Sequence, residues 1–426
     1  MAGEDKGGDE MVDRISELPD HIREFILGYL PISDAVRTSA LSRKWQHSWT
    51  RTNQLQLYFN YDMGKPMGVD RYFRLIGRIL LSHDGPIRRI VLHPLCHDNE
   101  GDIYTWLRVL SQRGMRDLTI LPDYVDGFEL PSSIFHCRGL SSLTVGRSCL
   151  RNSLEFRGFP NLVKLELHEV RIFEGVLENV LSNSPLEILY LRYCIFIDNL
   201  MFDVIAPNLR IFDILLDHTL YDISFKCVPK LRVASFSGQR LHDFNGSEDN
   251  FFDTLGSLRG LEVLTFDCRL HKTSPPNIIV KKLPDLLENL TTVILNYVDV
   301  TSVDHLLFVF CIIRSSPNLQ SLEIRMTVSH VWDLLFGVEA SKAARAYLKV
   351  VDKEEIKTSD TLTVKVKAMS GAESVEAEIG LIHSILSSCP TLAEMHIEFP
   401  FHQSVQLRRS IKRIGQSSTK TKISFF

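Results

Sequence analysis

Apolar residues recur along most of the chain in the pattern L-x-x-L-x-L, often directly after a proline-containing turn. Clear copies begin at Leu162, Leu186 and Leu319. Other copies begin at Leu209, Leu231 and Leu392 after a proline, and at Ile87, Met115, Leu140, Leu261 and Leu290 without one. Starts from 140 to 231 lie 22, 24, 23 and 22 residues apart, and those from 231 to 319 lie 30, 29 and 29 apart. A regular period of this length predicts stacked structural repeats.

This period is typical of leucine-rich repeats, in which each repeat contributes one strand to a curved parallel sheet. Helices at 173–181 and 303–313 have the apolar spacing expected for returning helices on the convex side. Proline ends such a helix and leads the chain into the next strand. An ordinary α/β domain with parallel strands is the alternative, but eleven copies in register favour an α/β solenoid, placed at residues 51–337.

Strand alternation assigns a face to each position of the repeat. The second and third apolar residues of L-x-x-L-x-L point inward, so the intervening residues point to the concave side. A surface of mixed charges and an aromatic ring suits protein binding, although the same residues could simply be solvated. The predicted substrate-binding residues are Lys164, Glu166, His168, Tyr190, Arg192, Asp213, Asp267, Glu323 and Arg325, and Glu394, His396 and Glu398 occupy the same positions further on.

The N-terminal segment carries more apolar side chains than a unit of its size can bury. Pro19 suits a first helical position, and apolar residues follow it at helical spacing until Pro31 ends the helix. Ser33 can cap a second short helix, and Ser42 a third that carries Trp45 and Trp49. Three short helices form too small a core to stand alone, so we expect a partner to cover the remaining side chains.

This segment resembles the F-box, on the residues Leu18-Pro19, Ile26-Leu27, Leu30-Pro31, Asp34-Ala35-Val36-Arg37-Thr38-Ser39, Leu41-Ser42 and Trp45. The resemblance places an F-box at residues 12–50. It implies docking on a Skp-type adaptor and, through it, on the cullin and RING subunits of an SCF-type ubiquitin ligase. A small helical cap on a larger domain is the alternative. The candidate adaptor-binding residues, some of which must form the unit's own core, are Leu18, Pro19, Ile22, Leu27, Leu30, Pro31, Val36, Leu41, Trp45 and Trp49.

The C-terminal stretch departs from the simple repeat. Patterns at 338–350 and 376–388 predict helices, and 361–367 alternates like a strand. A basic helix is predicted at 407–414. This order resembles the FBD domain that closes many plant F-box/leucine-rich-repeat proteins. We therefore assign 338–426 to an insertion and an FBD-like cap that covers the last strand edge, and 1–11 to a disordered lead-in.

Composition excludes several classes of function. The net charge of −4 does not favour nucleic acid or an anionic membrane, and no apolar run is long enough for a membrane span. The eight cysteines are scattered without a C-x-x-C pair, so we expect reduced, buried thiols in a cytoplasmic or nuclear protein. His93, Cys96 and His97 are close in sequence, but Pro94 interrupts helical spacing and we expect no metal site.

No nucleotide-binding or nucleophile motif is present in the sequence, so we expect no cofactor and no catalytic residue. The main hypothesis is a non-catalytic substrate-recognition subunit of the ligase. A non-degradative scaffold is the alternative. A small-molecule sensor would need convergent basic groups on the concave face, whereas the available ones alternate with acids.

Overall fold

The computed structural model describes residues 14–57, 69–93, 100–122, 128–151, 158–197, 201–216, 222–238, 255–270, 282–327, 337–353, 355–367, 375–398 and 421–425. The chain divides into two compact units, an N-terminal unit (Met1–Val176) and a C-terminal unit (Leu177–Phe426). The lead-in at 1–11 and the basic helix at 407–414 lie outside the described residues, and so does Glu354.

The N-terminal unit begins with short helices and continues with strands that each follow a helix or turn. Its elements are α1 (Asp20–Gly28), α2 (Ile32–Arg37), the 3-10 helices η1 (Thr38–Ala40) and η2 (Ser48–Arg51), β1 (Gln54–Leu57), α3 (Val69–Ser82), β2 (Arg89–Leu92), α4 (Glu100–Gln112), β3 (Asp117–Ile120), η4 (Ser132–His136), β4 (Ser142–Gly146), β5 (Cys149–Leu150), β6 (Lys164–His168) and β7 (Arg171–Ile172). Helix α5 (Val176–Asn183) spans the boundary between the units.

The C-terminal unit is richer in strands at its start and in helices at its end. Its elements are β8 (Ile188–Arg192), β9 (Ile195–Phe196), β10 (Met201–Ile205), β11 (Ile211–Leu216), β12 (Asp222–Cys227), β13 (Val233–Gly238), β14 (Val263–Asp267), the 3-10 helix η5 (Cys268–Leu270), β15 (Thr292–Asp299), α7 (Val303–Ser315), β16 (Ser321–Thr327), α8 (Gly337–Val351), β17 (Thr363–Lys367), α9 (Val375–Ser388), β18 (Glu394–Glu398) and β19 (Lys422–Phe425).

The predicted repeats are confirmed one by one. Each of the eleven apolar starts lies two residues before a strand, from Ile87 before β2 to Leu392 before β18. In every copy the first apolar residue and the two inward residues of the strand are buried. A single repeat could not bury these side chains, and stacking covers them with the repeats on either side.

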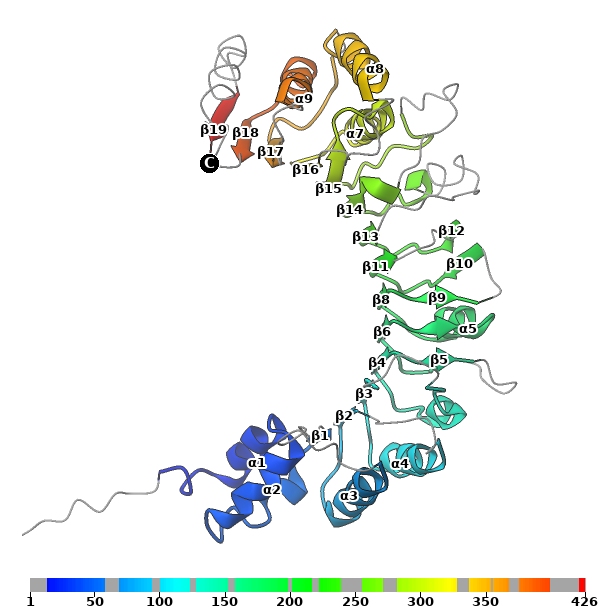
Figure 1. The fold of residues 1–426 in the computed structure, drawn as a ribbon, viewed down its shortest axis with the longest axis vertical. Coiled ribbons are helices and arrows are strands. Elements are labelled where there is room, and N and C mark those ends of the chain that lie inside the picture. The colour runs from blue at the N-terminus through cyan, green and yellow to red at the C-terminus, as the bar shows by residue number, and fades with distance from the viewer. Residues whose placement is uncertain are drawn as a thin grey trace, which may run out of the picture. The chain divides into compact units, whose positions relative to one another are not determined.

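Parallel pairing orders the strands within each unit. In the N-terminal unit β1, β2, β3, β4 and β6 pair successively in parallel. In the C-terminal unit the order is β8, β11, β13, β14, β15, β16, β17, β18 and β19, again all parallel. Figure 1 shows α7, α8 and α9 on the outer side of this second set of strands, so its opposite face is the concave one. The α/β fold class predicted from the sequence is therefore correct.

Asparagine side chains join successive repeats at the turn before the strand. Asn161 donates to the carbonyl oxygen of Arg138 at 2.9 Å. In the same way Asn289 donates to the carbonyl oxygen of Arg259 and Asn318 to that of Glu288, both at 2.8 Å. Each acceptor lies two residues before the first leucine of the preceding repeat. Each amide thus pairs with a turn carbonyl that the strand ladder leaves open, which fixes the spacing between repeats.

Phenylalanine rings form a continuous column in the core of the C-terminal unit. The rings of Phe212 and Phe236 lie 5.8 Å apart, those of Phe236 and Phe266 6.3 Å, and those of Phe266 and Phe308 4.6 Å. The column therefore runs across β11, β13 and β14 to helix α7. Phe225 of β12 packs edge-on against Phe212 at 5.2 Å. Aromatic contacts of this kind stabilise a core beyond their buried area.

The F-box segment differs from the sequence prediction in its helix boundaries. Pro19 is the N-cap of α1 rather than its first residue, because its ψ of 148° is extended. Pro31 caps α2, so Ser33 lies inside that helix instead of capping it. The predicted third helix from Ser42 is wrong, since residues 41–47 form turns and only the short η2 follows.

Backbone hydrogen bonds join the F-box to the first repeat of the N-terminal unit. The amides of Asp84 and Gly85 both donate to the carbonyl of Thr50, at 2.8 and 3.3 Å. The amide of Arg88 donates to Asn53 at 2.8 Å, and Pro31 forms a parallel bridge with Gln56. The F-box therefore packs directly on the strand that opens the repeat region.

His83 is a buried titratable group at this joint. Its Nε2 lies 2.8 Å from the carbonyl oxygen of Thr52, and its Nδ1 lies 3.2 Å from that of Gly85. Burial lowers the pKa of His83 below 6.5, although the two carbonyls and Asp84 oppose this change; Arg113 acts in the same direction as burial. The folded chain thus favours the neutral imidazole.

We expect the stability contributed by His83 to be complete above pH 6.5 and to be lost as the pH falls below it, because the unfolded chain then binds a proton more readily. One such group changes the free energy of unfolding by at most about 1.4 kcal/mol per pH unit. In denaturant titrations, the free energy of unfolding should decline less between pH 7.5 and 5.5 for His83→Gln than for the wild-type chain. His47→Gln, at an exposed position, is the control and should decline like wild type. An unchanged slope in His83→Gln would contradict this assignment.

The region assigned to the FBD-like cap extends the sheet instead of ending it. Strand β17 pairs with β16, β18 with β17, and β19 with β18. The predicted helices at 338–350 and 376–388 are observed as α8 and α9, and α8 packs against both α7 and α9. The edge of β16 is therefore covered by another strand of the same sheet.

Candidate protein-interaction surfaces

Exposed apolar side chains concentrate in the F-box. Of the thirteen large hydrophobic residues exposed in the described part of the chain, six lie between positions 15 and 41: Ile15, Phe25, Ile26, Tyr29, Val36 and Leu41. Phe25 and Ile26 of α1 lie four and three residues before Tyr29, the C-cap of the helix, so both are on the same side as Tyr29. Phe25 is 59% exposed and Tyr29 55%, with their rings in edge contact at 5.1 Å. An uncovered apolar face of this kind is typical of a protein-interaction surface.

The opposite face of α1 packs on a small core. Leu27, Ile32, Ala35 and Trp45 are buried there. The indole Nε1 of Trp45 donates to Ser16 Oγ at 3.2 Å. Helices α1 and α2 both carry apolar residues on two sides, which explains why the segment has more apolar side chains than its core needs. One set of these side chains builds the core, and the other set faces outward.

The structure therefore sorts the ten candidate adaptor-binding residues. Leu27 and Trp45 are buried in the F-box core, so a direct partner contact does not extend to them. Pro19, Val36 and Leu41 are exposed, while Leu18, Ile22, Leu30, Pro31 and Trp49 are half-buried. Sequence reasoning did not include Ile15, Phe25, Ile26 and Tyr29 in this set, although three of them belonged to the helical spacing that predicted α1.

In the N-terminal unit, the predicted substrate-binding residues of β6 form one polar cluster. Lys164 Nζ lies 2.8 Å from Glu166 Oε1, and His168 Nε2 lies 3.8 Å from Glu166 Oε2. Burial opposes ionisation of Glu166, but the hydrogen bonds of Lys164 and Thr144 and the charge of Lys164 outweigh it and lower the pKa of this carboxyl. The cluster is internally compensated and half-exposed.

In the C-terminal unit, β8 and β11 carry a second cluster. Arg192 lies 3.8 Å from Asp213 Oδ2, and its guanidinium is 5.8 Å from the centre of the Tyr190 ring. Burial raises the pKa of Asp213, and the charge of Arg192 opposes that shift. All three side chains remain half-exposed, as expected for a concave face.

Asp267 is the exception among the predicted surface residues. Both of its carboxylate oxygens accept hydrogen bonds from Arg269, at 3.1 and 2.7 Å, and the Gly238 amide donates to one of them at 3.4 Å. Arg269 in turn lies 3.4 Å from the centre of the Tyr297 ring. Asp267 is only 2% exposed beneath this guanidinium. Asp267 is therefore covered by Arg269, which its carboxylate holds against the ring, and a substrate contact of Asp267 itself stays a prediction.

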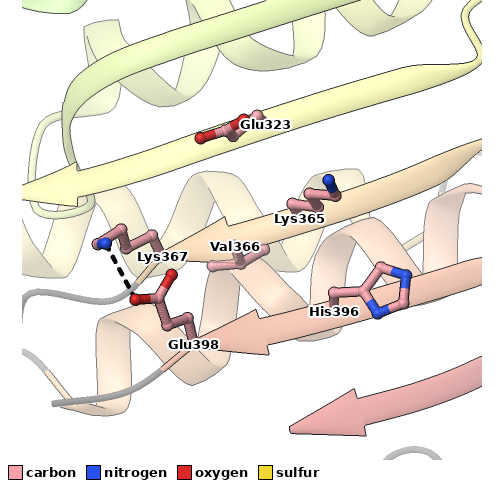
Figure 2. A pocket seen from close by; sticks show the side chains of 6 residues that line it. All are labelled: Glu323, Lys365, Val366, Lys367, His396 and Glu398. Atoms are coloured by element: carbon pink, nitrogen blue, oxygen red, sulfur yellow. Dashed lines mark hydrogen bonds and ion pairs between the residues drawn. The ribbon is translucent and has the colours of Figure 1, made fainter. Parts of the chain in front are cut away.

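Glu323 and Arg325 belong to a third cluster around a hollow of about 400 Å³. The hollow is lined by Glu323, Lys365, Val366, Lys367, His396 and Glu398, from β16, β17 and β18. Figure 2 shows the polar side chains of these strands around the hollow. Lys365 and Lys367 were missed in the sequence, although the alternation that predicted a strand at 361–367 already places them on the concave face.

Two remaining predictions concern cysteine and metal. Of the cysteines in the described residues, only Cys227 is exposed, which corrects the expectation that all are buried. Burial raises the pKa of the Cys137, Cys311 and Cys389 thiols to about 11, so they are protonated at neutral pH. Cys96 and His97 lie outside the described residues, and within these residues no group of His, Cys, Asp and Glu is arranged to hold a metal ion.

Family models match both parts of the chain. The F-box domain model matches residues 15–56, and a model described as FBD-associated F-box protein At5g56370, LRR repeats, matches residues 103–324. The F-box/FBD/LRR-repeat protein At1g13570 of Arabidopsis thaliana is 32% identical over 326 residues, which cover 74% of this chain and 76% of that protein. The chain belongs to the F-box/FBD/LRR-repeat family.

Other members of the family match shorter stretches. The F-box protein At4g09920 is 32% identical over 206 residues, covering 47% of this chain and 64% of that protein. The FBD-associated F-box protein At4g10400 is 32% identical over 180 residues, covering 41% and 43%. Both come from Arabidopsis thaliana. An F-box followed by leucine-rich repeats makes the chain a protein-interaction adaptor of the kind typical of SCF complexes.

None of the described helices has the length and apolar content needed to cross a membrane. The domain boundaries at residues 12–50, 51–337 and 338–426 stay predictions.

Proposed function

We propose that this chain is the substrate-recognition subunit of an SCF-type ubiquitin ligase. Its F-box docks on a Skp-type adaptor and thereby on the cullin and RING subunits, and the concave face of its repeats binds a protein substrate. The observation that carries the proposal is the uncovered apolar face of α1 on a segment matched by the F-box model. The chain itself makes and breaks no bonds in this scheme. It acts in the cytoplasm, the nucleus or both, where the other subunits operate.

Tethering explains how a non-catalytic chain promotes the reaction. A substrate held by the repeats and a loaded conjugating enzyme held by the RING subunit share one assembly. Their encounter becomes intramolecular, at an effective concentration on the order of millimolar. The mixed charges of the β6, β8 and β11 clusters suit a wet protein interface, whose specificity depends on complementary charge.

Phe25→Ala combined with Tyr29→Ala is expected to weaken adaptor binding by about 30-fold or more, because two exposed aromatic anchors contribute about 2 kcal/mol or more to such an interface. Titration calorimetry with a purified Skp1-type adaptor measures the change. Tyr104→Ala and Leu81→Ala remove exposed apolar residues outside the F-box and should bind like wild type. Circular dichroism should be unchanged in all three variants, because every replaced side chain is exposed.

Wild-type affinity in the double variant would overturn the proposed docking face. A separate measurement addresses degradation. Proteins captured by the full chain should become more abundant in cells when cullin activity is blocked. Unchanged abundance would favour the alternative, a scaffold that binds partners without promoting their turnover.

A further inference from the structure

The hollow on β16, β17 and β18 is built from two rows of side chains in register. Glu323, Lys365 and His396 are paired across the three strands, and Ser424 of β19 continues this row. Arg325, Lys367 and Glu398 form the next row. Neighbouring strands are about 4.8 Å apart and the rows about 6.6 Å apart, so the polar groups of both rows face one shallow space.

Each carboxylate of this surface already has a cationic partner. Glu323 is 2.8 Å from Arg325, and Glu398 is 2.9 Å from Lys367. Glu394, at the start of β18, is 3.2 Å from Lys422. The hydrogen bond and charge of Lys422 lower the pKa of the Glu394 carboxyl, which favours its ionised form.

Lys365 is the exception. It lies between Glu323 and His396 in register, yet within the described residues it has no ion pair or hydrogen bond, and its side chain is exposed. Four cationic side chains of this surface thus face three carboxylates, and the excess positive charge sits at the centre of the hollow. Figure 2 shows the Lys365 amine apart from the Lys367–Glu398 pair.

We propose that this hollow binds an acidic segment of the protein substrate, with a carboxylate of that segment on Lys365. This inference rests on the proposed function and names the class of substrate that the C-terminal end of the concave face would accept. An extended segment that runs along β17 repeats its alternate side chains at the spacing of Lys365 and Lys367. A second carboxylate of the segment could therefore displace Glu398 from its ion pair with Lys367.

The openness of the site favours a protein segment over a small molecule or a nucleic acid. Small ligands bind where most of their surface becomes buried, whereas Lys365, Lys367 and Glu398 are all exposed. Nucleic acid requires a row of cations that neutralises successive phosphates. Here the three carboxylates interrupt the row and would repel a phosphate backbone.

The test uses the full chain and a short fluorescent peptide of alternating Glu and Ala residues. A matched peptide with Gln in place of Glu is the neutral probe. By fluorescence anisotropy at low salt, we expect the Glu peptide to bind at least about 10-fold more tightly than the Gln peptide, with a difference that shrinks as salt rises. Equal affinity for the two peptides would overturn the proposal.

Three variants locate the binding. Lys365→Glu should lower affinity for the Glu peptide to that of the Gln peptide. Lys349→Glu makes the same charge change on an exposed position of α8 and should bind like wild type. Glu398→Gln should bind the Glu peptide several-fold more tightly, because it releases Lys367. Equal losses in Lys365→Glu and Lys349→Glu would overturn the proposal, as would Lys365-dependent binding of a thymidine oligonucleotide more tightly than the Glu peptide.

Adaptor binding separates this inference from the proposed function. Lys365→Glu should bind the Skp1-type adaptor like wild type, because the substitution lies outside the F-box. Normal adaptor binding without Glu-peptide selectivity would overturn only the acidic site. Lys365-dependent peptide binding in a chain that fails to bind the adaptor would overturn only the ligase assignment.

Discussion

Replacing Phe308 by alanine is expected to lower the free energy of unfolding of the C-terminal unit by about 3–5 kcal/mol. Phe308 is fully buried on α7, and its ring is the end of the aromatic column at 4.6 Å from Phe266. Its removal leaves a cavity between the helix and β14 that rigid strands on both sides cannot close. The loss combines the transfer energy of the ring with that cavity.

Urea titration of the full chain measures the overall loss, and hydrogen exchange locates it. Since each repeat contacts mainly its neighbours, protection should fall most in β14, β15 and α7. Phe308→Leu should lose less, because it keeps part of the buried volume. Val350→Ala, at a position that is 55% exposed on α8, should change stability by no more than about 0.5 kcal/mol. A loss in Phe308→Ala as small as that control would show that the column is not a stabilising core.

Trp45→Ala is expected to destabilise the F-box by about 3–5 kcal/mol and to abolish adaptor binding, although Trp45 does not reach the surface. Its ring is 3% exposed, and its loss leaves the Ser16 hydroxyl without its indole donor. In a unit with so few buried side chains, no other part of the core can compensate.

Comparing Trp45→Ala with the double variant Phe25→Ala, Tyr29→Ala distinguishes a residue of the F-box core from residues that contact the adaptor. Both variants should bind the adaptor more weakly than the wild-type chain, but only Trp45→Ala should also lose hydrogen-exchange protection in α1 and α2. Trp45→Phe should recover much of that protection because it restores most of the buried ring. If Trp45→Ala retained normal protection and lost binding alone, Trp45 would be a contact residue and the sorting of the F-box faces would be wrong.

The repeat region could be predicted closely because its physics is local and periodic. A leucine that must be buried at every strand makes each copy visible, and all eleven starts lie two residues before a strand. Strands β1 and β19 were not predicted, because each carries only an isolated part of the L-x-x-L-x-L pattern. In β1 this part is Leu55 and Leu57. Helices α3 and α4 were also missed, although Phe73, Ile76 and Leu80 recur at helical spacing.

The interaction surfaces were less predictable because burial depends on which neighbour covers a side chain. Both Leu27 and Phe25 are apolar residues of α1, yet one faces the core and the other faces solvent. Alternation placed Asp267 on the concave face correctly, but it could not show that Arg269, two residues further on, folds back over it. Lys365 could have been found by the same alternation, whereas its lack of a partner required the positions of three neighbouring strands.

The contacts of Thr50 and Asn53 with residues 84–89 bear on how members of such a family diversify. An exchange of gene segments with its breakpoint at residue 50 would separate Thr50 from the amides of Asp84 and Gly85, while Asn53 and β1 would stay with the repeats. A breakpoint just after β1 would also separate Asn53 from Arg88 and would leave β1 to pair with a foreign β2. Only hybrids that inherit the helices, β1 and β2 from one parent keep all of these contacts, so recombination can reassort the repeats without this mismatch only beyond β2.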